Sequence, residues 1–408
     1  MNSCPYRQAI LIQQALTPDK IRVSFFLGAG CPMAIRVAVG DDKATMSPLI
    51  PDITELTTRI AAGLSAEGAP SLKQVFEGLQ VKLTANKPPK IKSITIEHIL
   101  SHIRTLQDIV GDGEFDGMNK ETLSNLDLAI CNAVTAQVGK RLTSSDSPYH
   151  RLASWVSGIP REHAVEIFTT NYDLLMEQAF EEKQVPFFDG FVGSSRPFFD
   201  LTAIERDKLP SRWARLWKIH GSINWFKSDE DVVERLLGAD SKAQQMIFPS
   251  HLKYSQSRRM PYLAMLDQLR NVILQGQNIV ITCGYSFCDE HINDVILNAL
   301  RGNANAACFA LFYGDLNGYP DAVKAAKLCS NLTLIAADSG VINTQPVKWM
   351  PVTDKDDDPL TGKVIDVTKG EDDSIASVRC KLGDFAVFAE FLSQNLADRR
   401  RGLEAIKL

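Results

Sequence analysis

Four short strings of glycine and polar residues each follow an apolar run that is typical of a buried β-strand. In chain order they are Gly28-Ala29-Gly30-Cys31, Thr170-Asn171-Tyr172-Asp173, His220-Gly221-Ser222 and Gly284-Tyr285-Ser286-Phe287. If these strands form a parallel sheet, all four strings lie at its carboxyl edge, where such sheets bind nucleotides. The residue types predict a dinucleotide site with one histidine base.

The two glycine strings have the composition of loops that hold a phosphate-containing ligand. Gly28 and Gly30 permit a tight turn whose backbone N–H groups can approach a pyrophosphate. Met33 stands where the third glycine of a G-x-G-x-x-G fingerprint would be, so a plain tight turn is the alternative. After the later strand, Gly284 allows close backbone approach, and Ser286 offers a hydroxyl to a ribose or a phosphate.

His220 and Asn171 are the candidate catalytic residues. An imidazole titrates at about pH 6.5 in general, so it can accept a proton at neutral pH, although a lone histidine is often a satisfied core residue. The Asn171 amide could bind a ribose hydroxyl or a water, whereas a helix cap is the alternative for both Asn171 and Asp173. The sequence Asp289-Glu290-His291 resembles a catalytic cluster, but we expect it to begin a helix with Asp289 as the cap.

Composition and charge exclude several classes of protein. The chain has 408 residues, of which 45% are hydrophobic and 23% charged, and it contains no apolar run long enough to span a membrane. The formal charge of -5 equals the excess of eight acidic residues over three lysines within 351–374. No general nucleic-acid footprint is visible, and we expect a soluble, cytoplasmic protein.

The eight cysteines are dispersed and do not form a C-x-x-C pair. Because structural zinc sites use such pairs, the sequence predicts no metal and eight reduced thiols.

Periodicity predicts an α/β fold with a Rossmann-like, largely parallel sheet, a helical insertion and a C-terminal extension. We expect the core to comprise residues 1–62 and 148–340, because strands there alternate with helices. Two amphipathic helices fall within 63–147, the insertion. Residues 341–408 form the extension, which we expect to be loop or hairpin followed by a helix with Phe385, Phe388 and Phe391 on one face. These added segments could mediate assembly or partner contacts, or their apolar faces could be buried within the chain.

Together the four strings resemble the sirtuin superfamily, and more closely its NAD hydrolases of bacterial antiphage defence. The resemblance covers roughly residues 20–62 and 148–336 and implies a sirtuin-type core. It implies NAD as the substrate, with His220 as the base and Asn171 placing the water or ribose. The implied cofactor-binding residues are Gly28, Ala29, Gly30, Cys31, Thr170, Asp173, Gly284, Tyr285 and Ser286. A homo-oligomer is also implied, as is pairing with a HerA-type hexameric DNA-translocating ATPase.

The chain also departs from the conventional sirtuin pattern. It lacks the four-cysteine zinc module, and residues 48–55 replace the family's Pro-Asp-Phe-Arg segment. Both departures argue against an NAD-dependent protein deacylase, which is the first alternative to an NAD hydrolase. The second alternative is a non-catalytic scaffold that senses NAD or ADP-ribose for a nuclease or an ATPase.

Overall fold

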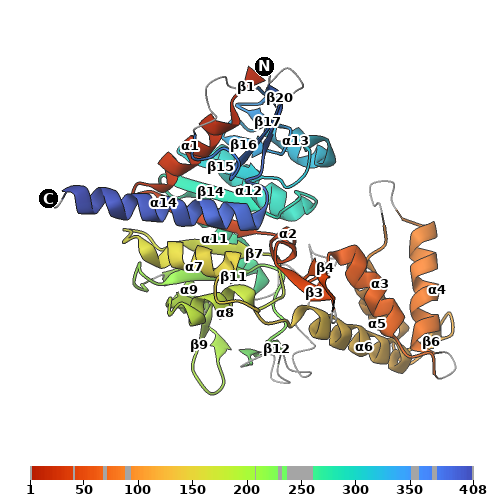
Figure 1. The fold of residues 1–408 in the computed structure, drawn as a ribbon. Helices are drawn as coiled ribbons and strands as arrows, with labels where there is room; N and C mark the ends of the chain where they lie inside the picture. The colour runs from red at the N-terminus through yellow and green to blue at the C-terminus, as the bar shows by residue number, and fades with distance from the viewer. Residues whose placement is uncertain are drawn as a thin grey trace.

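A ten-stranded sheet forms the centre of the molecule (Figure 1), in the order β1-β18-β17-β16-β15-β14-β2-β7-β11-β8. The computed structural model describes residues 2–39, 42–67, 71–87, 93–206, 208–227, 232–236, 261–350, 358–369 and 375–406. In chain order the strands of this sheet are β1 (Asn2–Ser3), β2 (Arg22–Leu27), β7 (Glu166–Thr169), β8 (Phe187–Phe188), β11 (Ala214–Lys218), β14 (Asn278–Cys283), β15 (Ala306–Leu311), β16 (Leu332–Ile335), β17 (Ser339–Ile342) and β18 (Gln345–Trp349). The strands from β16 to β8 run parallel to one another, which confirms the predicted α/β class.

The register aligns the ends of the four strands that precede the strings. Leu27 pairs with Cys283 on one side and with Thr169 on the other, and Thr169 pairs in turn with Lys218. The chain after each of these residues therefore leaves the sheet at the same edge. β7, the next strand of this sheet along the chain, lies on one side of β2, whereas the later strand β14 lies on its other side. The strand order therefore reverses at β2.

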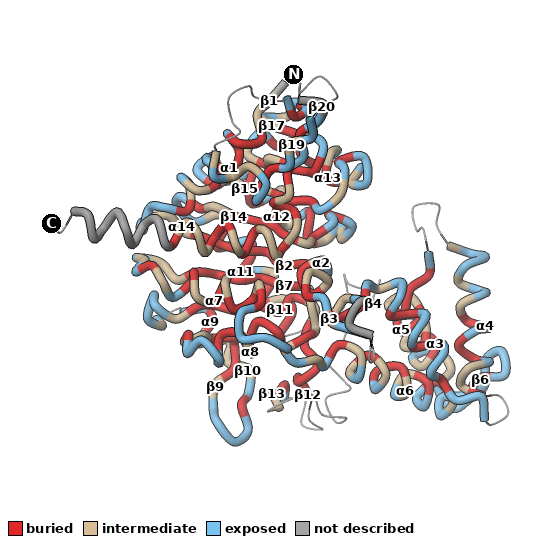
Figure 2. Tube along the Cα trace, viewed as in Figure 1, coloured by how far each residue is buried: buried red, intermediate tan, exposed pale blue. Residues whose placement is uncertain are grey.

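Helices cover both faces of the sheet because its central strands are buried on both sides. In β2, Phe25 belongs to one apolar cluster and Phe26 to the other, since successive side chains point to opposite faces. The first face is covered by α1 (Pro5–Leu16), α7 (Pro148–Gly158) and α14 (Phe385–Ile406), and the second by α11 (Tyr262–Leu274), α12 (Glu290–Gly302) and α13 (Pro320–Ala326). Figure 2 shows the buried residues concentrated between these layers.

The predicted insertion, together with the helix that precedes it, forms a helical lobe beside the core (Figure 1). Its helices are α3 (Ile53–Gly63), α4 (Leu72–Ala85), α5 (Ile96–Val110) and α6 (Lys120–Val138), with the short hairpin β5 (Glu114–Phe115) and β6 (Met118–Asn119) between the last two. Asp52 and Glu55 have the spacing of a capping box in the sequence, and the Asp52 carboxylate does accept from the N–H groups of Thr54 and Glu55. Glu55 pairs with Arg59 one turn later. Because α3 packs on α5 and α6, the helical lobe begins at residue 53 in space.

The remaining elements are short. They are α2 (Gly30–Met33), β3 (Arg36–Val39), β4 (Asp42–Pro48), α8 (Leu175–Glu182), β9 (Phe191–Val192), β10 (Phe198–Phe199), α9 (Leu201–Arg206), β12 (Trp225–Lys227), β13 (Val233–Arg235), η2 (Leu316–Gly318), β19 (Ile365–Lys369) and β20 (Ile375–Cys380). Within the described ranges, no helix combines the length and the apolar character needed to cross a membrane.

The segment after residue 340 is more ordered than its sequence pattern predicts. β17 and β18 form an antiparallel hairpin that continues the central sheet, and β18 pairs with β1 at the N-terminus. β19 and β20 form a separate antiparallel hairpin in the acidic region, as one of the two sequence interpretations proposed. Much of the acidic run itself, at 351–357 and 370–374, lies outside the described residues.

The phenylalanine face of α14 lies in the chain's own core. Phe385, Phe388 and Phe391 are 2%, 0% and 2% exposed, so this face is not available for partner contact. The hypothesis of a docking face here is therefore wrong, and the alternative of burial within the chain holds. The physical reason is that α14 packs on α7 and on the sheet face that contains Phe25.

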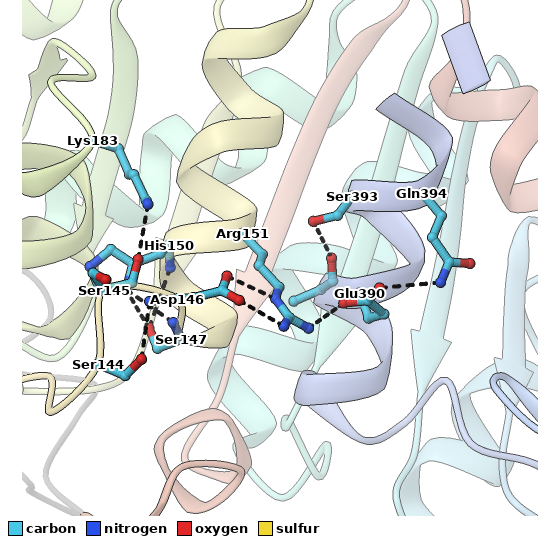
Figure 3. A network of polar contacts seen from close by, with 11 residues as sticks. Ser144, Ser145, Asp146, Ser147, His150, Arg151, Lys183, Glu390, Ser393 and Gln394 are labelled. Carbon is cyan, nitrogen blue, oxygen red and sulfur yellow. Dashed lines mark hydrogen bonds and ion pairs between the residues drawn. The ribbon is translucent and has the colours of Figure 1, made fainter. Parts of the chain in front are cut away.

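Polar contacts fix α14 to α7 at the rim of this apolar contact (Figure 3). Arg151 on α7 binds both carboxylate oxygens of Asp146, at 3.1 and 3.0 Å, and also pairs with Glu390 on α14. The neighbouring His150 is fully buried, with Nδ1 2.8 Å from the Ser147 hydroxyl and Nε2 2.7 Å from Glu182. His150 is thus a satisfied structural histidine, which is the common role of a lone histidine in a core.

Replacing Phe388 with alanine should destabilise the protein strongly. The change leaves a cavity beside the Phe25 ring, whose centroid lies 6.1 Å away. We expect the free energy of unfolding to fall by about 3–5 kcal/mol in urea denaturation. Phe198→Ala is the matched control, because Phe198 is 46% exposed. Equal, small losses in both variants would contradict the burial of α14 against the sheet.

Candidate active site

The four strings meet at the carboxyl edge of the sheet, as their register requires. They follow β14, β2, β7 and β11, which are consecutive neighbours in the sheet. Members of all four strings line one cavity of about 380 Å³ with the helical lobe on its other side; we call it the histidine cavity. From the strings it is lined by Ala29, Thr170, Asn171, Tyr172, Asp173, His220, Gly284, Tyr285 and Ser286.

The glycines of the first and last strings interlock backbone to backbone. A Cβ on Gly28 would lie 2.3 Å from the Gly284 carbonyl oxygen, and one on Gly30 would lie 2.8 Å from the Gly284 Cα. Gly284 itself has a φ of +67°, and a Cβ there would lie 2.6 Å from the backbone nitrogen of Cys31. Contacts this short leave no room for a side chain, so the glycines allow two adjacent loops to pack together.

Hydrogen bonds fix this pair of turns. The Gly28 N–H donates to the Cys283 carbonyl at 2.9 Å, and the Gly30 N–H donates to the Gly284 carbonyl at 3.0 Å. The Cys31 N–H donates back to Gly28 at 3.0 Å. These three N–H groups already have protein acceptors, so a pyrophosphate would have to compete with the protein for them. Contact between the two loops therefore accounts for these glycines, whereas the sequence analysis had explained Gly28 and Gly30 by a bound pyrophosphate or a tight turn.

Cys31 has the environment of a packing residue. Its side chain is fully buried, and its thiol donates to the Cys283 carbonyl at 3.2 Å. Burial, and next the contact with Cys283, raises the pKa of the Cys31 thiol well above its ordinary value. A thiol held neutral in this way is a poor nucleophile. All eight cysteines are free, and within the described part of the chain no cluster of three or more histidine, cysteine or acidic side chains could hold a metal ion.

Asn171 binds the glycine turn and does not cap a helix. Its side-chain Nδ2 donates to the Gly28 carbonyl at 3.0 Å, and its backbone N–H donates to the Thr169 hydroxyl at 3.0 Å. Thr169 in turn donates to the Leu27 carbonyl. Because Nδ2 is engaged, Oδ1 is the acceptor that the amide has for a ribose hydroxyl or a water. The Asn171 side chain therefore links the strings after β2 and β7.

The Asp173 side chain binds the backbone at the start of α8. Its carboxylate accepts from the Leu175 N–H at 3.0 Å, which supports the structural interpretation of this residue. Burial raises the pKa of the Asp173 carboxyl from an ordinary 3.8 to about 6, while the Lys218 ammonium and the Leu175 N–H partly oppose the rise. Lys218 donates to the Asp173 carbonyl and lies 2.9 Å from Glu177, so this buried ammonium is paired.

His220 lies in the turn that follows β11. Gly221, with a φ of +91°, turns the chain sharply, and the next two residues bind the Tyr172 carbonyl through the Ser222 hydroxyl and the Ile223 N–H. The His220 ring lies 6.5 Å from the Tyr172 ring, centroid to centroid. Its Nε2 is 3.3 Å from a carboxylate oxygen of Asp289, and its side chain is 15% exposed. The His220 ring is therefore open to the cavity, and Tyr172 and Asp289 are the neighbours that orient it.

Tyr285 and Ser286 play different parts in the last string. Tyr285 is buried, and its hydroxyl donates to Asn293 Oδ1 at 2.7 Å, so its side chain mainly anchors the loop to α12. Burial, and next Asp289, raises the pKa of the Tyr285 hydroxyl well above its ordinary value. Ser286 is exposed at the wall of the cavity. Of the two, Ser286 is the residue whose hydroxyl can reach a ligand.

The helical lobe supplies a wall of the histidine cavity that the sequence interpretation missed. Thr95, Glu97 and His98, at the start of α5, line the cavity opposite the sheet edge. The Tyr172 hydroxyl donates to Glu97 Oε1 at 3.3 Å and so joins the lobe to the second string. Burial, and next Glu97, raises the pKa of Tyr172 well above its ordinary value. No local pattern distinguishes Glu97 from any polar residue in the first turn of a helix, so the sequence could not have indicated this contact.

A second cavity of about 380 Å³ lies on the other side of the interlocked turns; we call it the aromatic cavity. It shares Gly284, Tyr285 and Ser286 with the histidine cavity. Its other walls include the exposed ring of Tyr313 and, from the C-terminal segment, Asp384. The string that follows β14 is thus a shared wall of the two cavities.

Comparison with known proteins shows that part of this chain is similar to a recognised domain. Residues 165–331 match the model of the SIR2-like domain, and this stretch carries the last three strings. None of the curated proteins matches the chain. Among solved structures, it is similar to a chain from work on the mechanism and regulation of Sir2 enzymes, with a TM-score of 0.35 and 11% identity over 81% of this chain and 92% of that one. The match to the SIR2-like domain supports a sirtuin-like fold around the site.

Asp173 should make the stability of the protein depend on pH. An acid with a higher pKa in the folded than in the unfolded state holds its proton longer when folded, so stability falls as pH rises between the two values. From about pH 4 to pH 7, wild type should lose on the order of 1–3 kcal/mol relative to Asp173→Asn. Urea denaturation across this range measures the difference. Asp19→Asn, at an exposed position, is the control, and a pH-independent difference for Asp173→Asn would contradict the raised pKa.

Proposed function

We propose that this protein is an NAD glycohydrolase that cleaves the nicotinamide–ribose bond to give nicotinamide and ADP-ribose. The observation that carries the proposal is the placement of His220 and Asn171 on one cavity, directly beside the interlocked glycine turns. A base, an amide and a glycine-lined passage at the carboxyl edge of a parallel sheet match what a dinucleotide hydrolase requires.

The two cavities suit the two halves of NAD. Each has a volume within the range of roughly 300–1,000 Å³ that is usual for small-molecule sites. The aromatic cavity offers the rings of Phe312, Tyr313 and Tyr319, on which an adenine base can pack. The histidine cavity receives the nicotinamide and its ribose. The shared wall, with the Ser286 hydroxyl, lies where the phosphates and the adenosine ribose would pass between them.

The chemistry needs a water, a base and stabilisation of positive charge. The bond between the ribose anomeric carbon and the nicotinamide nitrogen breaks with its electron pair going to nitrogen, so nicotinamide leaves neutral. Water attacks the anomeric carbon, and His220 takes the proton that the water loses. Asn171 places the water or the ribose, which lowers the entropic cost of reaching the transition state.

The charge distribution of the histidine cavity favours a cationic substrate. Glu97, Asp173 and Asp289 line it, and NAD brings a positively charged pyridinium ring. In the transition state this charge moves onto the ribose as an oxocarbenium-like ion. Fixed carboxylates near the ring and the ribose can stabilise both the bound cation and the developing one.

One structural feature favours hydrolysis over protein deacylation. Where conventional deacylases have their Pro-Asp-Phe-Arg segment, residues 48–55 of this chain link β4 to α3, and Ile50, Pro51 and Ile53 line the cavity. The cavity wall there is apolar and lacks the arginine and phenylalanine of the deacylase pattern. Mass spectrometry of NAD incubated with the protein separates three outcomes: nicotinamide with ADP-ribose, acylated ADP-ribose only with an acyl peptide, or binding without turnover.

Removing the His220 imidazole should abolish most of the activity without unfolding the protein. We expect His220→Ala to lower the NAD cleavage rate by about 10²–10⁴-fold, because the general base is lost. Asn171→Ala should lower it on the order of 10²-fold through misplacement of the ribose or water. His163→Ala is the control, because His163 precedes β7 at the opposite edge of the sheet. Wild-type rates in folded His220→Ala protein would remove this residue from the mechanism.

We propose NAD depletion in antiphage defence as the biological role, on the basis of the resemblance to sirtuin-like defence proteins. An unregulated enzyme of this kind would be toxic to its host, so control by assembly or by a partner is expected. Light scattering of the chain purified alone and after co-expression with a HerA-type ATPase tests the partner. A common complex is the expected result, and elution of the two proteins at their separate masses would contradict it.

A further inference from the structure

The loop between β14 and α12 holds Asp289 in a fixed position. Gly284 and Phe287 both have positive φ values, +67° and +59°, which shape a tight path from the strand to the helix. Asn293 on α12 donates to the Phe287 carbonyl at 2.7 Å and accepts from the Tyr285 hydroxyl at 2.7 Å. The loop is therefore tied to the helix that it begins, and Asp289 at its end has little freedom to move.

The two carboxylate oxygens of Asp289 do different things. Oδ1 accepts from the N–H groups of His291 and Ile292, at 3.1 and 3.4 Å, and so caps α12 as the sequence predicts. Oδ2 lies 3.3 Å from Nε2 of His220. A cap needs one oxygen, and serine or asparagine provides it about as well. The second oxygen, with its negative charge, is what a carboxylate adds.

The contact with Oδ2 affects which nitrogen of His220 carries the proton and how stable the protonated imidazole is. A carboxylate that faces one imidazole nitrogen favours a proton on that nitrogen and leaves the other nitrogen free to accept one. It also stabilises the imidazolium that forms when the base takes its proton. The 3.3 Å separation is longer than an ideal N–H···O bond of about 2.9 Å, and catalytic contacts often tighten when a ligand binds.

We propose that Asp289 is a positioning residue for His220: its Oδ1 anchors it to α12 while its Oδ2 orients the imidazole and stabilises its protonated form. The inference rests on the proposed role of His220 as the base. Asp289 is 9% exposed and His220 is 15% exposed, so the pair is largely screened from bulk water. Their interaction is therefore stronger than that of an ion pair on the open surface.

Other titratable groups lie near His220, and their ionisation also affects how the rate of NAD cleavage depends on pH. Those that line the same cavity are Glu97, His98, Tyr172, Asp173, Tyr285 and Cys288. Beneath the cavity, the Lys218 ammonium is paired with Glu177. A variant at position 289 leaves all of these in place, so a change in the titration of His220 reports on the Asp289 carboxylate.

Asp289→Asn tests the proposal because it keeps the size of the side chain and an oxygen able to cap α12. Two measurements are made: the pKa of His220 by NMR of histidine-labelled protein, with the signal assigned by its loss in His220→Ala, and the pH dependence of kcat/KM for NAD. We expect the His220 pKa and the acidic limb of the rate profile to fall together by about one unit. The maximal rate should fall on the order of 10²-fold or more.

Two further variants control for the cap and for charge. Asp289→Ser keeps a capping hydroxyl and removes both carboxylate oxygens, so it should show the same pKa shift while α12 remains folded. Asp294→Asn removes an exposed carboxylate from the same helix and should leave the His220 pKa and the rate unchanged. If one capping variant does not fold, the other supplies the measurement.

The outcomes separate the inference from the proposed function. An unchanged His220 pKa in a folded Asp289 variant, or a shifted pKa with wild-type rate, would overturn the positioning role while NAD cleavage by the wild type still stands. Absence of NAD cleavage by wild-type protein would overturn the proposed function, and the inference that rests on it. A loss of rate with an unchanged pKa would show that Asp289 acts only through the helix.

Discussion

The contact between the glycine turns that follow β2 and β14 is the constraint on which the rest of the site depends. These two strands are neighbours in the sheet but far apart in sequence, and their loops meet with no room for a Cβ at Gly28, Gly30 or Gly284. The contact brings the loop after β14 over the end of β2, and it directs that loop toward His220. A side chain at any of the three positions would separate the loops and displace Asp289 with them.

Around this contact, each string is tied to another by hydrogen bonds. Asn171 binds the carbonyl of Gly28, the residues after His220 bind the carbonyl of Tyr172, and Asp289 faces His220. The candidate catalytic groups therefore lie on loops whose backbones are fixed to each other and to register-aligned strands. Such preorganisation is what catalysis by positioning requires, because little reorganisation remains when the substrate binds.

Added segments complete the site on both sides of the sheet edge. The helical lobe brings Glu97 and His98 to the histidine cavity, and the C-terminal segment brings Gly383 and Asp384 to the aromatic cavity. Gly383 passes so close to the end of β15 that a Cβ would lie 2.0 Å from the Phe312 backbone. Both segments look like appendages in the sequence, yet each forms part of a cavity wall, so the core alone would not enclose either cavity.

The sequence by itself determined the strands that precede the four strings and the edge of the sheet at which the strings lie. The bounds of β2 and β14 agree with the apolar runs at 22–27 and 278–283, because a strand buried on both faces needs an uninterrupted apolar segment. The helix caps at Asp52 and Asp289 were also predictable, since capping depends on residues within one turn. Only the tertiary structure decided which groups meet across the loops: the second oxygen of Asp289 with His220, Glu97 with Tyr172, and the β17–β18 hairpin with the sheet. These contacts join residues distant in sequence, and they depend on how whole elements pack, which no local pattern of residues records.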